Sequence, residues 1–441
     1  MAAISQSSDN PCQCLPAAQR SKPMRILILG INYYPERTSV SPFTTGLSEH
    51  LAAQGHTVRV VTAFPYYPEW RIWDEYRGRI TQLETRRGVE VRRVRHFIPS
   101  RASSLLQRLA HDFSFTAAAL VAGLAAGECD VVYCSCPPPA LALAAFLISR
   151  IRNVPYSIKL TDLASDAAIA TGILKDGTLL GWARAIERFA YRHASAVVCL
   201  CEAFRERLAR DGLPATQMAV IPDWGDTEAV RPVRGDGSFR RAYGIGSEQF
   251  VVLHTGNMGK KQDLLNVVRA AQRTRSEPNL LWVIVGEGEE RALIERAGKM
   301  LPNLRMLPLQ PAAGLCQMYA DADILLLNQK TAVKDAVIPS KLLTYMAAGK
   351  PVLCAANAES EAARLIREAQ CGRTVAPENP EALAEGALAL RANAPMRQTM
   401  GTNGRAYAIS NFEKARVLSL YDDLFAGLLH RPDARAAIAA G

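Results

Sequence analysis

Continuous apolar runs alternate with amphipathic segments along most of this chain. The first run, over residues 24–30, reads M-R-I-L-I-L-G and is typical of a strand buried on both faces of a parallel sheet. A predicted helix over 43–54, ended by Gly55, and a second apolar run over 57–62 follow it. Because parallel strands need a crossover connection, this order predicts a β-α-β unit. Its repetition predicts an α/β fold with doubly wound sheets.

The alternation is interrupted once, where Pro, Gly and Asp residues replace the apolar periodicity between residues 222 and 237. We therefore predict a first domain over 24–222, a linker over 223–237 and a second domain over 238–405. A chain of 441 residues, of which 49% are hydrophobic, is sufficient to form the two cores that this division requires.

The two ends of the chain differ from the domains. Residues 1–23 are polar, rich in Ser, Gln and Pro, and lack the apolar region of a secretory signal. They are predicted to form a disordered leader of a protein that resides in the reducing cytoplasm. Residues 401–430 are predicted to be helical with one apolar face, and 431–441 to form a tail.

The composition narrows the classes of ligand. A formal net charge of +10 is modest for this length and favours anionic small molecules or an anionic lipid surface over nucleic acid. The ten cysteines are interpreted as core or reduced surface thiols, with metal binding as the alternative for three C-x-C pairs. These pairs are Cys12/Cys14, Cys134/Cys136 and Cys199/Cys201. No second pair of ligands accompanies them, so no metal site is predicted.

Arginines greatly outnumber acidic residues between positions 71 and 108. This segment runs into an apolar helix, predicted over 105–126, whose uncharged part is too short to indicate a membrane span. A basic flank beside an apolar helix suits attachment to an anionic lipid surface. The alternative is a solvated, arginine-rich strand pair beside an ordinary core helix. The preceding aromatic loop, 63–70, is interpreted either as loop packing or as a surface that stacks on sugar rings.

The stretch 335–355, D-A-V-I-P-S-K-L-L-T-Y-M-A-A-G-K-P-V-L-C-A, predicts a short helix that begins beside a loop. Ser340 is predicted to cap it by accepting from free amides, and Gly349 to end it in the left-handed conformation. The first backbone amides of the helix, which have no partner within it, and the positive end of the helix dipole lie beside Lys341. They would form a binding site for an anion such as a diphosphate. A structural helix-turn-strand corner is the alternative interpretation.

Two further groups of polar residues follow predicted strands. In the glycine loop T-G-N-M-G-K-K-Q-D, Gly256 and Gly259 would let backbone amides approach phosphate, and Lys261 could neutralise a leaving diphosphate. In the first domain, Asp162 follows the strand predicted over 155–160, at the edge where catalytic groups of α/β folds collect. Helix capping is the alternative role for this aspartate. The chemistry is therefore predicted to lie between the two domains.

Three segments occur in an order that matches a known family. They are 32–70, which begins N-Y-Y-P-E-R, then H-T-G-N-M-G-K-K-Q over 254–262, and P-S-K-L-L-T-Y-M-A-A-G-K-P-V over 339–352. Together they resemble the glycosyltransferase family 4 enzymes of the colanic acid and exopolysaccharide type, over about residues 24–430. The resemblance implies a GT-B fold, in which two Rossmann-like domains face each other and a C-terminal helix, 406–430, crosses back onto the first.

The same resemblance implies a nucleotide-sugar donor on the second domain and an acceptor on the first. It also implies metal-independent transfer with retention at the anomeric carbon, and no cofactor besides the donor substrate. Lys261 and Asp162 are assigned catalytic roles. The substrate-binding positions that match are Gly256, Asn257, Gly286, Glu287, Leu307, Pro308, Ser340, Lys341 and Thr344 in the second domain, and Ser39, Val40 and Ser41 in the first.

The chain departs from the family pattern where the donor ribose would bind. Many members carry two glutamates with seven residues between them, and Ala336 and Thr344 occupy these positions here. The usual basic residue near Asn257 is also absent. These departures keep two alternatives open, a nucleotide-sugar 2-epimerase of the same architecture and a non-catalytic partner that tethers an assembly to the membrane. The resemblance implies a lipid-linked saccharide acceptor at the inner face of the cytoplasmic membrane, with either a GDP- or a UDP-sugar as donor.

Overall fold

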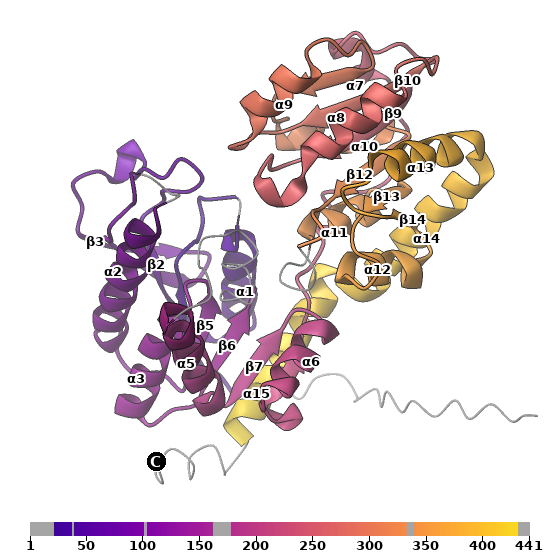
Figure 1. Ribbon diagram of the computed structural model, residues 1–441. Helices are drawn as coiled ribbons and strands as arrows, with labels where there is room; N and C mark the ends of the chain where they lie inside the picture. The colour runs from indigo at the N-terminus through magenta and orange to yellow at the C-terminus, as the bar shows by residue number, and fades with distance from the viewer. Residues whose placement is uncertain (1–21, 38, 101–103, 162–177, 333–338, 431–441) are drawn as a thin grey trace, which may run out of the picture.

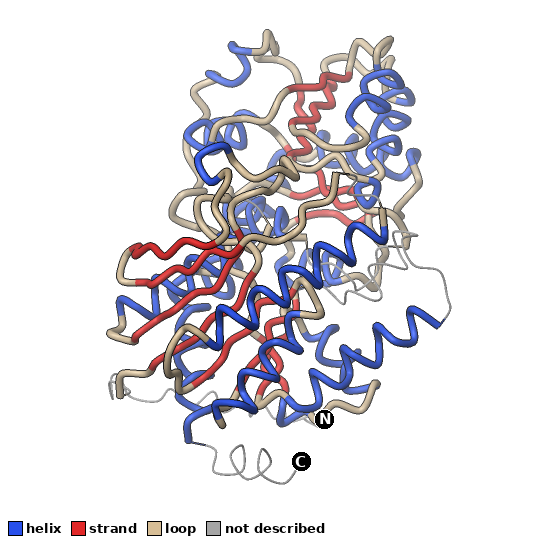
Figure 2. Tube along the Cα trace, turned by 90° about the vertical axis from the view of Figure 1, so that its left-hand side faces the viewer, coloured by secondary structure: helices blue, strands red, loops and turns tan. Residues whose placement is uncertain are grey.

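The computed structural model describes residues 22–37, 39–100, 104–161, 178–332 and 339–430. Asp162, Asp335 and Ala336 lie outside these residues. The described chain forms two α/β domains, each built on its own sheet (Figure 1). Figure 2, turned by 90°, shows the strands of the two sheets as separate groups, one above the other.

The first sheet has eight strands in the order β3-β4-β2-β1-β5-β6-β7-β8. All neighbours are parallel except β3 and β4, which pair antiparallel. Its strands are β1 Arg25–Gly30, β2 Thr57–Ala63, β3 Thr81–Arg86, β4 Val89–Val94, β5 Val131–Cys136, β6 Tyr156–Leu160, β7 Ala196–Cys199 and β8 Met218–Val220. Its helices are α1 Ser41–Ala53, α2 Leu105–Leu124, α3 Leu141–Arg152, α5 Thr178–His193 and α6 Glu202–Arg210, with short 3-10 turns η1 Asp74–Tyr76 and η2 Ala215–Gln217.

The second sheet has six parallel strands in the order β11-β10-β9-β12-β13-β14. They are β9 Phe250–Thr255, β10 Leu280–Val285, β11 Leu304–Leu307, β12 Ile324–Asn328, β13 Val352–Ala355 and β14 Gly372–Val375. The remaining elements are α7 Ser238–Ala242, η3 Lys260–Gln262, α8 Leu264–Arg273, α9 Arg291–Gly298, η4 Ala312–Gly314, α10 Leu315–Asp321, α11 Ser340–Ala347, α12 Glu361–Ala369, α13 Pro380–Ala392, α14 Ala394–Phe412 and α15 Lys414–His430.

The apolar runs are buried as parallel strands must be when helices cover both faces. Every residue of β9, β10, β12 and β13 is buried, and hydrophobic clusters lie on both faces of each sheet. The predicted α/β fold with two doubly wound sheets is therefore confirmed. The eight cysteines in the described residues are free thiols, and all but Cys316 are buried.

The C-terminal helix α15 returns to the first domain, as predicted. Val417, Tyr421 and Phe425 pack in the same cluster as Leu47 and Tyr133 of that domain, and Figure 1 shows the yellow helix running back beneath the first sheet. The prediction of one continuous tail helix is wrong.

The break in this tail lies at Glu413, which is extended at φ −61° and ψ 135°. The backbone there pairs with the linker, where the Gly225 amide donates to the Phe412 carbonyl at 2.9 Å. This contact removes the helical conformation at one residue. As a result, α14 packs against α11, α12 and α13 of the second domain, whereas α15 packs on the first.

A buried charge pair fixes the linker to both α15 and the first sheet. Lys159 of β6, which is 2% exposed, donates to the carboxylate of Asp223, at the start of the linker, and bonds with Tyr421 of α15. Burial alone would lower the pKa of Lys159, but the charges and hydrogen bonds of Asp223 and Tyr421 together outweigh it, and the pKa is raised. Three segments far apart in the sequence therefore meet at one ammonium group.

Part of the arginine-rich segment forms the antiparallel strand pair β3–β4. Arg93 in β4 is 1% exposed and bonds with Glu84 of β3 at 2.6 Å. Arg86 stacks over Tyr34 at 3.3 Å, and its guanidinium also pairs with Glu49 of α1. These arginines stabilise the fold. Within the described residues, α2 and the other helices are too short or too polar to cross a bilayer.

Candidate active site

The candidate donor site is built from loops at the carboxyl edge of the second sheet. Parallel strands carry their following loops at one edge, which is where ligands of open α/β sheets bind. The loops after β9, β10 and β11 contain the predicted positions from Gly256 to Pro308, and α11 begins after β12. The predicted residues therefore come from four separate segments that the topology brings to one edge.

Close glycine contacts hold the first two loops together. Gly256, Gly286 and Gly288 have φ of 107°, 151° and 158°, in the region that favours glycine. A Cβ on Gly286 would lie 1.9 Å from the Gly256 carbonyl oxygen, so no other residue fits without moving the loops. The Met258 amide donates to the Glu287 carbonyl at 2.8 Å.

The nucleoside-side positions are joined to the same loops. The Gly286 amide donates to the Leu307 carbonyl at 3.2 Å. Arg291, at the start of α9, donates to the Gly286 and Leu307 carbonyls and pairs with the Glu287 carboxylate at 3.0 Å. Gly286, Glu287 and Leu307 are thus brought together, and Pro308 follows directly at the exposed end of β11. Arg291, which orders them, was not predicted.

Lys341 is the charged side chain that lies against the glycine loop. A Cβ built on Gly256 would be 3.4 Å from Lys341 Cε and 3.5 Å from Nζ. The Nζ group also lies 3.3 Å from His254 Nε2 and 3.2 Å from Gln262 Oε1. His254 Nδ1 is 3.1 Å from the Leu326 carbonyl, so it carries the proton and leaves Nε2 to accept from Lys341.

Burial sets the charge state of this pair. It lowers the pKa of Lys341 to about 7. Burial also holds the pKa of His254 well below its ordinary value, and the positive charge of Lys341 lowers it further. The imidazole is therefore neutral at physiological pH, and the amine is close to half protonated. An anion at Gly256 would favour the ammonium form, because opposite charges stabilise each other most strongly where water is excluded.

The start of α11 differs from the prediction. Pro339 occupies the N-cap position and Ser340 is the first helical residue, so Ser340 makes no capping hydrogen bond with its side chain. Instead, the Leu342 amide donates a hydrogen bond to the Pro339 carbonyl at 2.8 Å. Ser340 is exposed at the helix end, and Gly349 ends the helix at φ 67°, as predicted. Thr344 lies one turn after Lys341 and is half-buried.

The backbone around Lys261 is held at both ends. Its carbonyl accepts from the Lys330 amide at 3.0 Å, and the Asn328 side chain donates to the Gln262 and Asp263 carbonyls at 2.8 and 3.0 Å. Asn257 is exposed in the same loop, beside Gly259. The loop that carries Lys261 is thus fixed by β12, which belongs to a different part of the chain.

In the first domain, the predicted residues Ser39, Val40 and Ser41 form the start of α1. Ser39 has φ 60°, a left-handed conformation that glycine adopts more readily than serine. Val40 is the N-cap residue, and the buried Ser41 hydroxyl donates to the Glu36 carbonyl at 2.6 Å. Glu36 itself accepts from the Tyr66 and Tyr67 amides at 2.8 Å, which joins this loop to the aromatic loop after β2.

Sequence reasoning missed His254, Gln262 and Glu36. His254 was visible as a polar residue within a buried apolar run, F-V-V-L-H-T, immediately before the glycine loop. Its partner Lys341 is 87 residues away in the sequence, so no local pattern could reveal the contact. Within the described residues, no three His, Cys, Asp or Glu side chains gather closely enough to hold a metal ion.

Both domains match known protein families. Residues 39–224 match the family described as the glycosyl transferase 4-like domain, and residues 236–407 match glycosyl transferases group 1. The chain is 30% identical over 408 residues to the putative colanic acid biosynthesis glycosyl transferase WcaI of Escherichia coli K12, covering 90% of this chain and 98% of that protein.

Two solved structures share the fold over 92% of this chain and 100% of their own. They are sucrose-phosphate synthase from Thermosynechococcus elongatus, at a TM-score of 0.71 and 15% identity, and Anabaena HepE in complex with UDP-glucose, at 0.67 and 16%. The chain therefore belongs to the family 4 glycosyltransferases of the colanic acid type, with the GT-B fold.

Proposed function

We propose that the protein transfers a sugar from a nucleotide-diphosphate donor to a lipid-linked saccharide in exopolysaccharide biosynthesis, with retention and without a metal ion. The observation that carries the proposal is the contact of Lys341 with Gly256, where an ammonium group lies beside a loop that only glycine can form. This arrangement offers positive charge and backbone amides to one diphosphate.

The mechanism uses fixed positive charge to stabilise the leaving group. As the sugar–phosphate bond breaks, negative charge grows on the diphosphate oxygen, where Lys261 and Lys341 would stabilise it. These two lysines would provide the charge compensation that a divalent ion provides in other transferases. The acceptor hydroxyl would attack the anomeric carbon from the face that the diphosphate leaves and pass its proton to the departing diphosphate oxygen, which gives retention at the anomeric carbon.

The comparisons support the choice of donor and pathway. HepE, which has the same fold, binds UDP-glucose. WcaI is named for colanic acid biosynthesis and matches nearly the whole chain. A UDP-sugar is therefore the first donor to test, with GDP-sugars as the alternative class.

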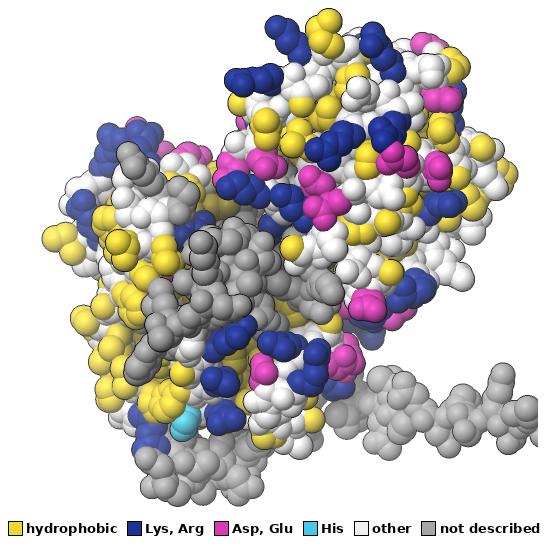
Figure 3. Space-filling model, in the orientation of Figure 1, with side chains coloured by type: hydrophobic (Ala, Val, Ile, Leu, Met, Phe, Trp, Pro, Cys, Tyr) yellow, Lys and Arg dark blue, Asp and Glu magenta, His cyan; other side chains and the backbone are white. Residues whose placement is uncertain are grey.

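Attachment to the inner face of the cytoplasmic membrane is proposed for α2. Leu106, Phe113 and Val121 are 79%, 51% and 69% exposed, and their spacing of seven and eight residues places them on one helix face. Figure 3 shows hydrophobic side chains gathered on the left-hand side of the first domain. An apolar face near basic residues suits an anionic bilayer, and it would bring a lipid-linked acceptor to the domain. Failure of the protein to sediment with vesicles that contain anionic lipid would contradict this.

The described residues do not favour the epimerase. An epimerase needs a general acid and a general base beside the donor sugar. His254, the histidine at the glycine loop, has Nδ1 engaged with the Leu326 carbonyl and Nε2 with Lys341. Neither nitrogen is free to exchange a proton with a sugar.

The full-length protein provides the test. It is incubated with UDP-glucose or GDP-mannose and a lipid-diphosphate-linked saccharide, with and without EDTA, and the product is examined by NMR for its anomeric configuration. We expect release of the nucleoside diphosphate and formation of an α-linkage from an α-donor, unchanged by EDTA. Absence of any thermal shift or turnover with both classes of donor would contradict the function.

A pH dependence of donor binding follows from Lys341. In the ligand-free protein, burial lowers the pKa of Lys341 to about 7, so its amine loses its charge as the pH rises above 7. A bound diphosphate favours the charged ammonium form. Binding then takes up a proton, so the affinity for UDP is expected to fall as the pH rises from 7 to 9, by up to about tenfold per pH unit. His254 remains neutral throughout this range, because burial and the charge of Lys341 lower its pKa.

Titration calorimetry in buffers of different ionisation enthalpy measures this proton uptake directly. Replacement of Lys341 by glutamine should weaken UDP binding at pH 7 and flatten the profile above it. A profile in the Lys341→Gln variant as steep as that of the wild type would assign the pH dependence to another group.

A further inference from the structure

The two central strands of the second sheet separate at the edge that carries the donor loops. The pairing of β9 with β12 ends at Leu253 and Leu325. Beyond these residues β9 stays paired with β10 to Thr255, and β12 stays paired with β13 to Asn328. The order of the sheet also reverses at β9, because the chain continues to β10 on one side and returns to β12 on the other. Ligands of open α/β sheets bind at such a point, so the groups that fill this split lie at the ligand-binding edge.

Polar side chains join the two strands across the split. The Leu326 carbonyl of β12 accepts hydrogen bonds from His254 Nδ1 of β9 at 3.1 Å and from the Tyr345 hydroxyl of α11 at 3.4 Å. The Thr255 amide of β9 donates to the same hydroxyl at 3.0 Å. His254 and Tyr345 are 0% exposed, so water does not replace a hydrogen bond that is lost here.

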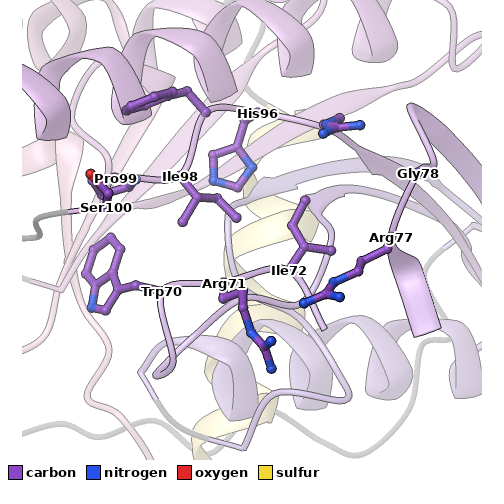
Figure 4. Close-up of a pocket in the computed structure, with 11 residues that line it drawn as sticks. Trp70, Arg71, Ile72, Arg77, Gly78, His96, Ile98, Pro99 and Ser100 are labelled. Carbon is purple, nitrogen blue, oxygen red and sulfur yellow. The ribbon is translucent and has the colours of Figure 1, made fainter. Parts of the chain in front are cut away.

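A histidine of the first domain shows that burial alone does not provide such partners. His96 is buried and lines a cavity of about 710 Å³, beside Ile98 (Figure 4). Among the described residues, neither ring nitrogen of His96 has a hydrogen-bond partner. Both ring nitrogens of His254 are bonded, one to Leu326 and the other to Lys341. The bonds around His254 are therefore a specific feature of the split.

Tyr345 and Lys341 lie one turn apart on the same face of α11. The hydrogen bond between Tyr345 and Thr255 holds this face against the last residue of β9. The next residue in the chain is Gly256, where a Cβ would lie 3.5 Å from Lys341 Nζ. One bond at the end of β9 thus sets the position of the helix turn that carries the ammonium group.

The other contacts of α11 are less specific near Lys341. Leu342, Leu343 and Met346 pack in the apolar cluster beneath the helix, and apolar burial has no preferred direction. Arg405 donates a hydrogen bond to the Ala347 carbonyl at 2.9 Å, which holds the far end of the helix. Tyr345 therefore provides the directional contact in the turn next to Lys341.

We propose that Tyr345 is a positioning residue of the donor site, whose hydroxyl bridges the split between β9 and β12 and holds α11 in the register that places Lys341 at Gly256. Tyr345 is fully buried, so it does not touch the donor and acts through Lys341. The inference rests on the proposed function, in which Lys341 and the glycine loop bind the donor diphosphate. Hydrogen bonds from a charged group require short, well-aligned contacts, so a small shift of the helix weakens them.

The test is a double-mutant cycle on UDP binding, measured by titration calorimetry with the full-length protein. Tyr345→Phe keeps the ring and removes the hydroxyl, so α11 loses its bond with Thr255. We expect this change to weaken UDP binding at pH 7 about tenfold in the wild type, as loss of a charged hydrogen bond does. In Lys341→Gln, where the positioned group is already gone, it should weaken binding less than about twofold. Losses that multiply would show that Tyr345 does not act through Lys341 and would overturn the proposal.

Tyr319→Phe is the matched control. The Tyr319 ring lies 6.0 Å from that of Tyr345, and its hydroxyl is 3.4 Å from Thr255 Oγ1. Both tyrosines are buried, so both variants remove a hydroxyl from one cluster and should lower the melting temperature. Tyr319 lies on α10 rather than α11, so UDP binding should weaken only in Tyr345→Phe. Equal losses of affinity in the two variants would contradict the assignment to Tyr345.

The pH profile adds a readout that a purely structural role would not change. In the part of the chain that the structure describes, the titratable group that faces Lys341 Nζ is His254, which stays neutral from pH 7 to 9. The fall in UDP affinity over this range therefore reports on Lys341, whose pKa is lowered to about 7 by burial. In Tyr345→Phe the amine is no longer held in its buried place and keeps its charge to higher pH, so the profile should flatten. A profile as steep as that of the wild type would count against the proposed role.

The outcomes separate this inference from the proposed function. UDP binding to the wild type that is unchanged in Tyr345→Phe overturns the role of Tyr345 and leaves the proposed function standing. Absence of binding of both UDP and GDP to the wild type contradicts the proposed function, and the inference with it.

Discussion

Replacement of Lys261 by alanine is expected to lower the rate of sugar transfer about a hundredfold. Loss of one group that stabilises developing charge typically costs about 3 kcal/mol in the transition state. The loop around Lys261 is fixed by the Lys330 amide and by Asn328, so neighbouring charge cannot easily move into its place. The loss should appear mainly in kcat, because the charge on the diphosphate grows as the bond breaks.

The chain offers a matched control in the preceding residue. Lys260 lies in the same 3-10 turn, is exposed, and carries the same charge. Lys260→Ala is expected to change the rate less than threefold, the range of a screened surface charge. Steady-state kinetics of both variants, with UDP affinity measured separately, distinguish transition-state stabilisation from simple binding. Equal losses in the two variants would mean that only the general positive field of the loop matters.

Replacement of Asp223 by alanine is expected to destabilise the first domain by about 3–5 kcal/mol. The substitution leaves the ammonium of Lys159 buried without its counter-charge, which is the costly way to break an internal ion pair. The effect should reach α15, because Tyr421 bonds with the same ammonium. Urea unfolding followed by tryptophan fluorescence measures the loss, with Trp224 next to the substitution as a reporter.

A double variant separates the lost pair from the buried charge. Lys159→Met removes the ammonium, so Asp223→Ala combined with Lys159→Met should recover most of the lost stability. The Lys159 ammonium also lies 4.8 Å from the ring of Phe43, a contact that the methionine replaces with apolar packing. If the double variant unfolds as readily as Asp223→Ala, the carboxylate stabilises the linker by a route other than Lys159.

The site could be predicted from sequence only where its residues are close in the chain. The glycine loop around Gly256 and the segment P-S-K gave their positions because each is a short pattern with a local conformational cause. Ser340 shows the limit of such patterns, because the N-cap residue is Pro339 and the predicted N-cap, Ser340, is the first residue of the helix. The charge state of Lys341 and its contact with His254 depend on groups from separate segments of the chain.

The two α/β sheets could be inferred from the sequence alone, and their order of elements predicts the edge for the donor site. Apolar periodicity fixes which segments are buried, and the order of strand and helix fixes how parallel strands connect. Tertiary structure alone decided the break at Glu413, the pairing of Lys159 with Asp223 and the contact of Lys341 with His254. These depend on distances between segments far apart in the chain and on the exclusion of water at the points where they meet, neither of which a local pattern of residues encodes.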